Sequence, residues 1–354
     1  MINRDQNQSI NRNKPVIGIT MGDINGIGPE VVIKALKDSR VLNLITPVIF
    51  GSTKTLAYYR KMFELHNFQY SQVKAEGLIN HHKINVVNCW EEMVEINVGQ
   101  VTAEGGQCAY KSLKKGVSYL KEGHVDALVT APINKKNIQS KDFDFVGHTE
   151  FLTTEFKADD SLMLMVTENV RVGLVSAHIP IREVADYVTS EKVESKLKIF
   201  IKTLREDFGI EKPKIAVLGL NPHAGEEGMI GTEEKEVLDP LINKLRKQGK
   251  LVFGPFPPDG FFATLQHKNY DGILAMYHDQ GLIPFKLMDF ALGVNYTAGL
   301  SVVRTSPDHG TAYGIAGKNV ADPTSMQEAV YLAAQIVKNR KNEIRVVSKS
   351  EEEF

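Results

Sequence analysis

Three of the ten histidines follow short apolar runs that have the composition of β-strands. His178 follows VGLVSA, His223 follows IAVLGLNP, and His278 follows ILAMY. In a parallel sheet the carboxyl ends of neighbouring strands share one edge, and α/β proteins bind their ligands at that edge. Imidazole nitrogens from three such positions can hold a divalent metal ion while leaving coordination positions open for substrate or water. The pattern therefore predicts a three-histidine metal site.

The alternative is three independent loop histidines, because a single histidine is more often a hydrogen-bonding residue than a metal ligand. The sequence spacing between the three is wide, and no short metal motif such as HExxH is present. The shared position after a strand, rather than any local motif, favours the metal site.

A second group of residues suits an anionic ligand. Lys286 lies in PFKLM, Arg304 lies in SVVRTS, and Asn295 lies in a stretch rich in glycine and hydroxyl groups. A phosphate group binds several hydrogen-bond donors and positive charge at once, which these side chains can supply. Because lysine and arginine are usually solvated, their apolar and small neighbours are what indicate a binding site.

The elements that must position these residues alternate along the chain. Strand-like apolar runs are separated by longer amphipathic stretches, an alternation that predicts an α/β architecture with a largely parallel sheet. Helices are expected over 191–208, capped by Ser190 and ended by Gly209, and over 233–248, ended by Gly249. The expected strands are residues 16–20, 47–50, 84–88, 126–130, 162–166, 172–176, 215–220 and 271–276.

Length and charge restrict the class of protein further. A chain of 354 residues is long enough for about two domains with a cleft between them. With 42 Lys and Arg against 43 Asp and Glu, the net charge of -1 argues against a nucleic-acid partner. The polar N-terminus lacks the apolar core of a signal peptide, and no run has the length of a membrane span. We therefore expect a cytoplasmic protein with no membrane partner.

The first expected strand leads into MGDINGIGPEVV, which resembles a nucleotide-binding loop only weakly. Gly26-Ile27-Gly28 is followed by Pro29, so the dinucleotide fingerprint GxGxxG is incomplete. The second strand ends in Gly51-Ser52, where a ribose-binding acid would be expected. The local pattern favours a structural turn, with Pro29 in the first turn of a helix.

Seven stretches taken together resemble one known family. They are GDINGIGPE, TAPINK, GHTEFL, AHIPI, LNPHAGEEG, MYHDQGLIPFK and RTSPDHGTA. Their order and number resemble the 4-hydroxythreonine-4-phosphate dehydrogenase family of pyridoxal-phosphate biosynthesis, within the isocitrate/isopropylmalate dehydrogenase-like group. The resemblance extends from about Pro15 to Asp322, which is nearly the whole chain.

The resemblance implies two α/β/α domains around a largely parallel sheet, with an active-site cleft between them. It divides the chain into a polar tail (1–14), a first domain (15–135 with 305–345), and a second domain (136–304) that carries the metal histidines and the dimer interface. It also implies a homodimer with its active site at the subunit interface. NAD or NADP would bind without a Rossmann motif, which would account for the incomplete fingerprint, and the cofactor-binding residues stay unassigned.

The family's functional residues map onto the positions picked out above and add two more. The resemblance implies that His178, His223 and His278 bind one divalent ion, whether Zn, Mg, Mn or Co. His148 and Thr149 would contact a small phosphorylated four-carbon substrate, and the substrate pocket would be completed by Lys286, Asn295 and Arg304. By residue type and position, Asp259 and Asp279 are both candidates for the base that takes the hydroxyl proton.

The sequence departs from the family at four places: Ile24-Asn25 replaces Pro-Ala, Pro257-Pro258-Asp259-Gly260 replaces P-A-D-T, Ser301 replaces Pro, and Gly314 replaces Asp. These changes concern the substrate and cofactor contacts, because the three histidines and the Lys/Asn/Arg set are intact. The alternative substrates are threonate or erythronate 4-phosphate. More distant alternatives are acyl transfer to phosphate, which needs no three-histidine site, and a binding protein without activity.

Overall fold

The computed structural model describes residues 14–75, 78–289 and 291–352, so residues 1–13 of the expected polar tail lie outside the described residues. The chain divides into two compact units: one ends at Leu152 and also includes Val302–Lys338, and the other contains Thr153–Ser301 and the residues from Asn339 on. Residues 136–152 and 302–304, expected in the second domain, thus belong to the first unit, whereas residues 339–345, expected in the first domain, belong to the second unit. No helix in the described part of the chain combines the length and apolar character needed to cross a membrane.

The first unit is built on a parallel sheet. Its strand order is β3-β4-β2-β1-β5-β12, and every neighbouring pair runs parallel. The central strands are buried along their length, which is why they appear in the sequence as continuous apolar runs. The strands are β1 (Val16–Thr20), β2 (Thr46–Gly51), β3 (Tyr70–Gln72), β4 (Ile84–Asn88), β5 (Ala127–Thr130) and β12 (Val303–Pro307).

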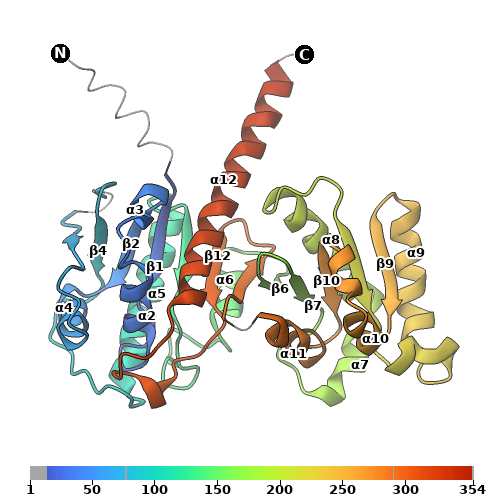
Figure 1. The fold of residues 1–354 in the computed structure, drawn as a ribbon, viewed down its shortest axis with the longest axis horizontal. Coiled ribbons are helices and arrows are strands. Elements are labelled where there is room, and N and C mark those ends of the chain that lie inside the picture. The colour runs from blue at the N-terminus through green and yellow to red at the C-terminus, as the bar shows by residue number, and fades with distance from the viewer. Residues whose placement is uncertain (1–13, 76–77, 290, 353–354) are drawn as a thin grey trace. The chain divides into compact units, whose positions relative to one another are not determined.

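Helix α5 (Ala103–Lys121) packs across β1, β2 and β5 of this sheet (Figure 1). Gly116 permits the close approach, because a Cβ atom there would lie 2.9 Å from Leu128 Cδ1 and 3.3 Å from Phe50 Cδ2. The other helical segments that begin in this unit are α2 (Gly28–Ala35), α3 (Val41–Leu44), α4 (Thr53–Met62), α6 (His148–Glu155), η5 (Tyr313–Ile315) and α12 (Thr324–Glu352); α6 and α12 continue into the second unit.

The second unit has a mixed sheet with the strand order β11-β6-β7-β10-β8-β9. Strand β6 runs antiparallel to both of its neighbours, whereas the pairs from β7 to β9 are parallel. The strands are β6 (Leu162–Val166), β7 (Arg171–Leu174), β8 (Lys214–Leu218), β9 (Leu251–Phe256), β10 (Gly272–Ala275) and β11 (Val294–Ala298).

Helices α8 (Ser190–Glu206) and α11 (His278–Asp289) cover opposite faces of this sheet. Phe200 of α8 packs against Gly173, whereas Gly281 of α11 packs against Val172 and Leu174 on the same strand. Successive strand residues point to opposite faces, so the two helices enclose the sheet. The remaining segments are η1 (Ile181–Glu183), α7 (Val184–Tyr187), η2 (Pro222–Gly228), η3 (Glu234–Leu238), α9 (Asp239–Lys247), α10 (Pro258–Ala263) and η4 (Gln266–Asn269).

The expected α/β architecture with a largely parallel sheet is confirmed, and each expected strand overlaps an observed one. Two helix details differ from expectation. Thr189, not Ser190, caps α8, because the Thr189 hydroxyl accepts a hydrogen bond from the backbone N–H of Lys192. The second expected helix begins with the π-helical turn η3 and then continues as α9 to Lys247. Both helices are followed by a glycine with positive φ, Gly209 at 70° and Gly249 at 78°, as predicted.

Candidate active site

The three predicted metal ligands follow three consecutive parallel strands. The strand order β7-β10-β8 places His178, His278 and His223 after neighbouring carboxyl ends. Strand neighbours lie about 4.8 Å apart, so side chains from three adjacent ends can reach a common point. The topology thus gives the sheet edge that the sequence pattern required.

Polar side chains tie these strand ends together. The Ser176 hydroxyl donates to the carbonyl of Met276 at 2.8 Å, which joins the segment before His178 to the segment before His278. Gln280 joins the other pair of ends. Its side-chain oxygen accepts from the Met276 N–H at 2.7 Å, and its side-chain nitrogen donates to the carbonyl of Gly219, which follows β8, at 2.6 Å.

Two of the three imidazoles face one another. The ring centroids of His178 and His278 lie 6.1 Å apart. His278 Nδ1 is 2.7 Å from a carboxylate oxygen of Asp279, an arrangement that orients the ring and leaves Nε2 for a ligand. Within the described part of this single chain, no three His, Cys, Asp or Glu side chains lie close enough together to hold one metal ion. The structure therefore pairs His178 with His278 and does not group His223 with them.

His223 lies on a left-handed turn. Residues 223–227 of η2 all have positive φ, between 43° and 81°, and Gly228 follows at 95°. Left-handed backbone costs roughly 1–2 kcal/mol for each residue with a Cβ atom, and His223, Ala224, Glu226 and Glu227 all have one. Such a turn persists only where its surroundings hold it.

The two other expected substrate residues of the second unit are Lys286 and Asn295. Lys286 lies on α11, two turns after His278, and is half-buried. Asn295 lies on β11, and its side-chain oxygen is buried without a hydrogen-bond partner among the described residues. A buried amide oxygen without a partner is unfavourable, so Asn295 is a natural position for a ligand donor.

The first unit holds the other expected substrate residues, His148, Thr149 and Arg304. Arg304 on β12 is only 3% exposed and donates through Nε and Nη2 to the hydroxyl of Thr130 at 3.0 and 2.6 Å. His148 and Thr149 begin α6, and His148 Nε2 is buried without a hydrogen-bond partner among the described residues. A buried guanidinium near an unpartnered ring nitrogen suits an anion that supplies acceptor oxygens.

The pKa values of His148 and Arg304 have the same main cause. Burial lowers the pKa of His148 well below 6.5, and the positive charges of Arg304 and Lys135 lower it further. Burial also lowers the pKa of Arg304 to about 10, although the Glu150 carboxylate opposes this shift. His148 is therefore neutral at pH 7 and offers a ring nitrogen beside two cations. Sequence reasoning missed Lys135, which is exposed in the TAPINKK stretch.

Asp23 is a second residue that sequence reasoning missed. Its fully buried carboxylate accepts from Asn137 Nδ2 at 2.7 Å, from the Tyr313 hydroxyl at 2.8 Å, and from the Asn25 N–H at 2.9 Å. These partners come from loops that follow β5, β12 and β1. Asp23 thus fixes three loops at the carboxyl edge of the first sheet. The local sequence GDINGIG does not indicate this role.

The departures from the family pattern lie in two kinds of environment. Asn25 is fully buried, and its side chain donates to the Thr102 hydroxyl and accepts from the Asn97 N–H, both at 2.9 Å. Gly260 and Gly314 have no atom within 4 Å of an added Cβ. Ser301 is exposed, and its carbonyl accepts from Arg340 Nη1 at 3.3 Å. The first change is thus structural, whereas Gly260, Ser301 and Gly314 occupy open positions.

Asp259, one of the two candidate bases, is exposed in the first turn of α10. Asp279, the other, is exposed and is engaged with His278. The geometry favours an orienting role for Asp279, whereas no contact with the described residues assigns a role to Asp259.

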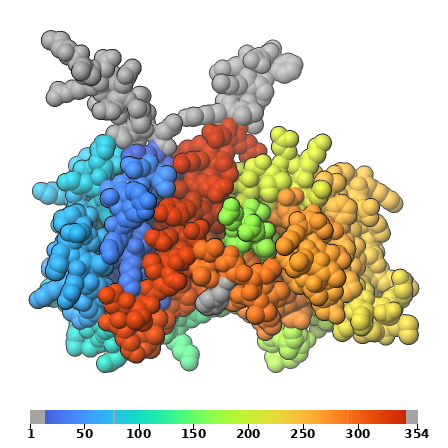
Figure 2. All heavy atoms as spheres, in the orientation of Figure 1, coloured from blue at the N-terminus to red at the C-terminus, as the bar shows by residue number. Residues whose placement is uncertain are grey.

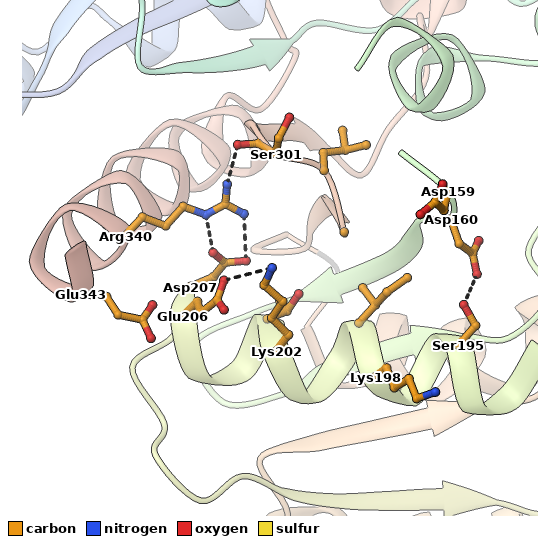
Figure 3. Close-up of a pocket in the computed structure, with 14 residues that line it drawn as sticks. Asp159, Asp160, Ser195, Lys198, Lys202, Glu206, Asp207, Ser301, Arg340 and Glu343 are labelled. Atoms are coloured by element: carbon orange, nitrogen blue, oxygen red, sulfur yellow. Dashed lines mark hydrogen bonds and ion pairs between the residues drawn. The ribbon is translucent and has the colours of Figure 1, made fainter. Parts of the chain in front are cut away.

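A cavity of about 480 Å³ in the second unit is lined by Ser301 but by none of the predicted site residues (Figure 3). Two ion pairs lie in its wall: Arg340 pairs with Asp207, and Lys202 lies 3.7 Å from Glu206. We assign it no part in the chemistry, because none of the predicted metal or substrate residues lines it.

Comparisons with known proteins show the family of the chain. The model of the family "Pyridoxal phosphate biosynthetic protein PdxA" matches residues 43–333. A 4-hydroxythreonine-4-phosphate dehydrogenase of Bacteroides thetaiotaomicron is 46% identical, over 94% of this chain and 91% of the relative. A protein of Oceanobacillus iheyensis named "Putative D-threonate 4-phosphate dehydrogenase" is 36% identical, over 91% of this chain and 98% of the relative.

Solved structures give the same result. The crystal structure of a 4-hydroxythreonine-4-phosphate dehydrogenase from Klebsiella pneumoniae matches with a TM-score of 0.79 and 36% identity, covering 92% of this chain and 98% of that chain. A terephthalate 1,2-cis-dihydrodiol dehydrogenase from Burkholderia xenovorans matches with a TM-score of 0.62 and 27% identity, covering 91% and 98%. From the family model and these relatives, the chain belongs to the PdxA family.

Proposed function

We propose that the protein is a cytoplasmic, homodimeric dehydrogenase that oxidises 4-phosphooxy-L-threonine with NAD or NADP and a divalent metal ion. The substrate's secondary alcohol becomes a ketone, its hydride reduces the nicotinamide, and its hydroxyl proton is released. The product, 2-amino-3-oxo-4-phosphooxybutanoate, then loses CO2 and takes up a proton at the same carbon to give 3-amino-2-oxopropyl phosphate. This reaction would supply an intermediate of pyridoxal 5'-phosphate biosynthesis.

One observation carries the proposal. In a chain of this family, the ring centroids of His178 and His278 lie 6.1 Å apart. The strand before His223, β8, lies next to β10, the strand before His278. The donor set fits a divalent ion, because imidazoles bind such ions in the neutral form and Asp279 leaves His278 Nε2 accessible. A bound ion would polarise the substrate hydroxyl and the developing ketone, and NAD(P) would accept the hydride.

The chain's own residues would bind and orient the substrate. Arg304 and neutral His148 offer donors for an anionic group in the first unit, and Lys135 adds positive charge to the same region. Lys286 and Asn295 offer an ammonium group and an amide in the second unit. We assign the substrate phosphate to Arg304 and Lys286 by residue type, since charged donors form the strongest hydrogen bonds to phosphate.

The hydroxyl proton needs an acceptor within hydrogen-bond reach of the substrate. Because Asp279 already accepts from His278, its replacement should act mainly through the orientation of that ring. Asp259 has no such engagement, so we propose it as the base. An Asp259→Asn variant should keep its metal and lose kcat, whereas Asp279→Asn should weaken metal binding.

His223 would complete the metal site from a second copy of the chain, as a dimer with its active site at the subunit interface allows. Mixing His178→Ala with His223→Ala chains tests this. If the ligands come from two subunits, each mixed dimer regains one intact site, and random pairing restores about a quarter of the wild-type metal content. If all three ligands come from one chain, mixing restores none. Equal metal content in wild type and the separate His223→Ala protein would reject His223 as a ligand.

The activity is tested with purified, metal-loaded protein and three substrates: 4-phosphooxy-L-threonine, threonate 4-phosphate and erythronate 4-phosphate. NADH or NADPH appearance with the first substrate, abolished by chelation, is expected. Turnover of only the other two would establish the second candidate function, which the 36% identical relative named for D-threonate 4-phosphate favours. No reduced cofactor from any of the three would reject the dehydrogenase.

A further inference from the structure

The loop that carries His223 is held by a single buried carboxylate, that of Glu234. Glu234 is the first residue of η3 and is 2% exposed. Its Oε1 accepts from the backbone N–H of Leu220 at 2.6 Å and from that of Asn221 at 2.7 Å. Both donors precede the left-handed turn, so the carboxylate fixes the backbone where the turn begins.

The same carboxylate also contacts the turn through a side chain and through packing. Oε2 of Glu234 accepts from Asn221 Nδ2 at 2.9 Å, and that amide also donates to Glu233 at 2.6 Å. A Cβ atom on Gly225, in the middle of the turn, would lie 2.6 Å from Oε2. The carboxylate thus fills the inside of the turn, where no larger residue than Gly225 fits.

The hydrogen bonds within the turn do not replace this anchor. The Ala224 N–H donates to the Asn221 carbonyl at 3.1 Å, and the Ile230 N–H donates to the Gly225 carbonyl at 3.1 Å. Each closes a short loop, and neither connects the turn to β8. His223 and its acidic neighbours Glu226 and Glu227 are exposed, and the segment around residues 225–250 forms part of the surface in Figure 2, drawn in yellow.

We propose that Glu234 is a positioning residue for His223. Through Leu220, Asn221 and the space beside Gly225, it holds the turn in the left-handed conformation that directs the imidazole. The strained backbone persists because a carboxylate that receives three donors compensates for it. This inference rests on the proposed function only where it connects His223 to a metal ion.

The experiment compares Glu234→Gln with Glu236→Gln, a matched control on the exposed side of the same π-helical turn. Glutamine keeps the size of Glu234 but replaces one of its two acceptor oxygens with an NH2 donor, so it cannot accept on both sides as the carboxylate does. In metal-free Glu234→Gln protein, backbone amides at 220, 221 and 224–230 should exchange at least ten times faster than in wild type. The control should exchange as wild type does.

The second readout is Co²⁺ binding, followed by calorimetry and by the visible spectrum of the bound ion. Glu234→Gln should bind Co²⁺ about 10–100 times more weakly, the usual effect of losing a group that orients a ligand. Its spectrum should move toward that of His223→Ala. A purely structural role would lower the Tm while leaving the Co²⁺ affinity and spectrum of the folded protein unchanged.

Two results would overturn the inference: wild-type amide exchange in Glu234→Gln, or faster exchange combined with wild-type Co²⁺ affinity and spectrum. If wild type itself binds no Co²⁺, the proposed metal site fails, and the exchange comparison alone decides whether Glu234 holds the turn. If Glu234→Gln does not fold, Asn221→Ala replaces it, because that change removes only the amide that bridges the two carboxylates. Faster exchange at 224–230 is expected there too, and its absence counts against the inference.

Discussion

Replacing Arg340 with alanine should destabilise the second unit more than any exposed charge change. Arg340 Nε donates to Asp207 Oδ1 at 2.5 Å, and Nη2 lies 3.3 Å from Asp207 Oδ2 (Figure 3). Nη2 also lies 3.1 Å from the Tyr296 hydroxyl. The Tyr296 hydroxyl donates to Asp207 Oδ2 at 2.6 Å. Asp207 is 2% exposed, so Arg340→Ala leaves a buried carboxylate without its counter-charge.

The magnitude follows from the burial of the two partners. Removing one member of a buried ion pair costs about 3–5 kcal/mol, most of it from the remaining unpaired charge. Arg340 is 24% exposed and the Tyr296 hydroxyl stays in place, so the lower limit, about 3 kcal/mol, applies. For a domain of about 150–250 residues, 1 kcal/mol corresponds to roughly 2–4 °C, which gives a fall in Tm of about 6–12 °C.

Scanning calorimetry of full-length protein measures this shift in the transition of the second unit. Arg40→Ala is the matched control, because Arg40 pairs with Asp38 at 2.5 Å but is 86% exposed, and solvent screens such a pair. Its Tm should equal that of wild type. Adding Asp207→Asn to Arg340→Ala should recover part of the lost stability, since it removes the unpaired charge. An equal fall in Tm for Arg340→Ala and Arg40→Ala, or no recovery of Tm in the double variant, would refute the reasoning.

Three further outcomes are expected. Gly281→Ala should lower the Tm, because the new Cβ would meet Val172 Cγ1 at 2.8 Å and Ala275 Cβ at 3.0 Å. Gly260→Ala places its Cβ in open space within a helix and should raise the Tm by about 2–4 °C. Changes of Tm in the same direction for both variants would contradict the packing argument. The pKa of His148 is lowered in the folded state, so as the pH drops below about 6.5 the unfolded chain binds a proton at this residue and the folded protein does not. Stability therefore falls with pH in this range. The Tm of His148→Asn should fall less steeply as the pH is lowered. Arg304→Ala should reduce kcat/KM for phosphorylated substrate more than for its dephosphorylated analogue, and equal loss would exclude phosphate recognition.

The strands that the sequence predicted are those whose burial produces continuous apolar runs. Strands 16–20, 84–88 and 162–166 agree with β1, β4 and β6 at both ends. Four strands were missed: β3, β9, β11 and β12. Two of these carry mixed signals, because β9 contains Gly-Pro within LVFGPF and β12 carries Arg304 within VRTSP. Their place in the sheet depends on neighbouring strands rather than on their own composition.

The site was predictable to the extent that topology defines it. Each of the three histidines follows an apolar run, which indicates that it lies after the end of a strand. The strand order β7-β10-β8 makes these three strand ends adjacent. The side-chain bonds of Ser176 and Gln280 that join the ends were not predictable, since serine and glutamine are common on surfaces. Asp23 and Lys135 were missed for the same reason, because their roles depend on partners that are distant in the chain.

The turn that carries His223 shows most clearly where local reasoning ends. Within NPHAGEEG, Gly225 and Gly228 permit positive φ, but Glu226 and Glu227 would ordinarily predict right-handed backbone. The information that reverses this preference lies beyond the turn, in Glu234, whose carboxylate receives the two N–H groups that precede the turn. A conformation that opposes the preference of its own residues needs a non-local cause, so the direction of the His223 imidazole is determined by Glu234 as much as by residues 221–228.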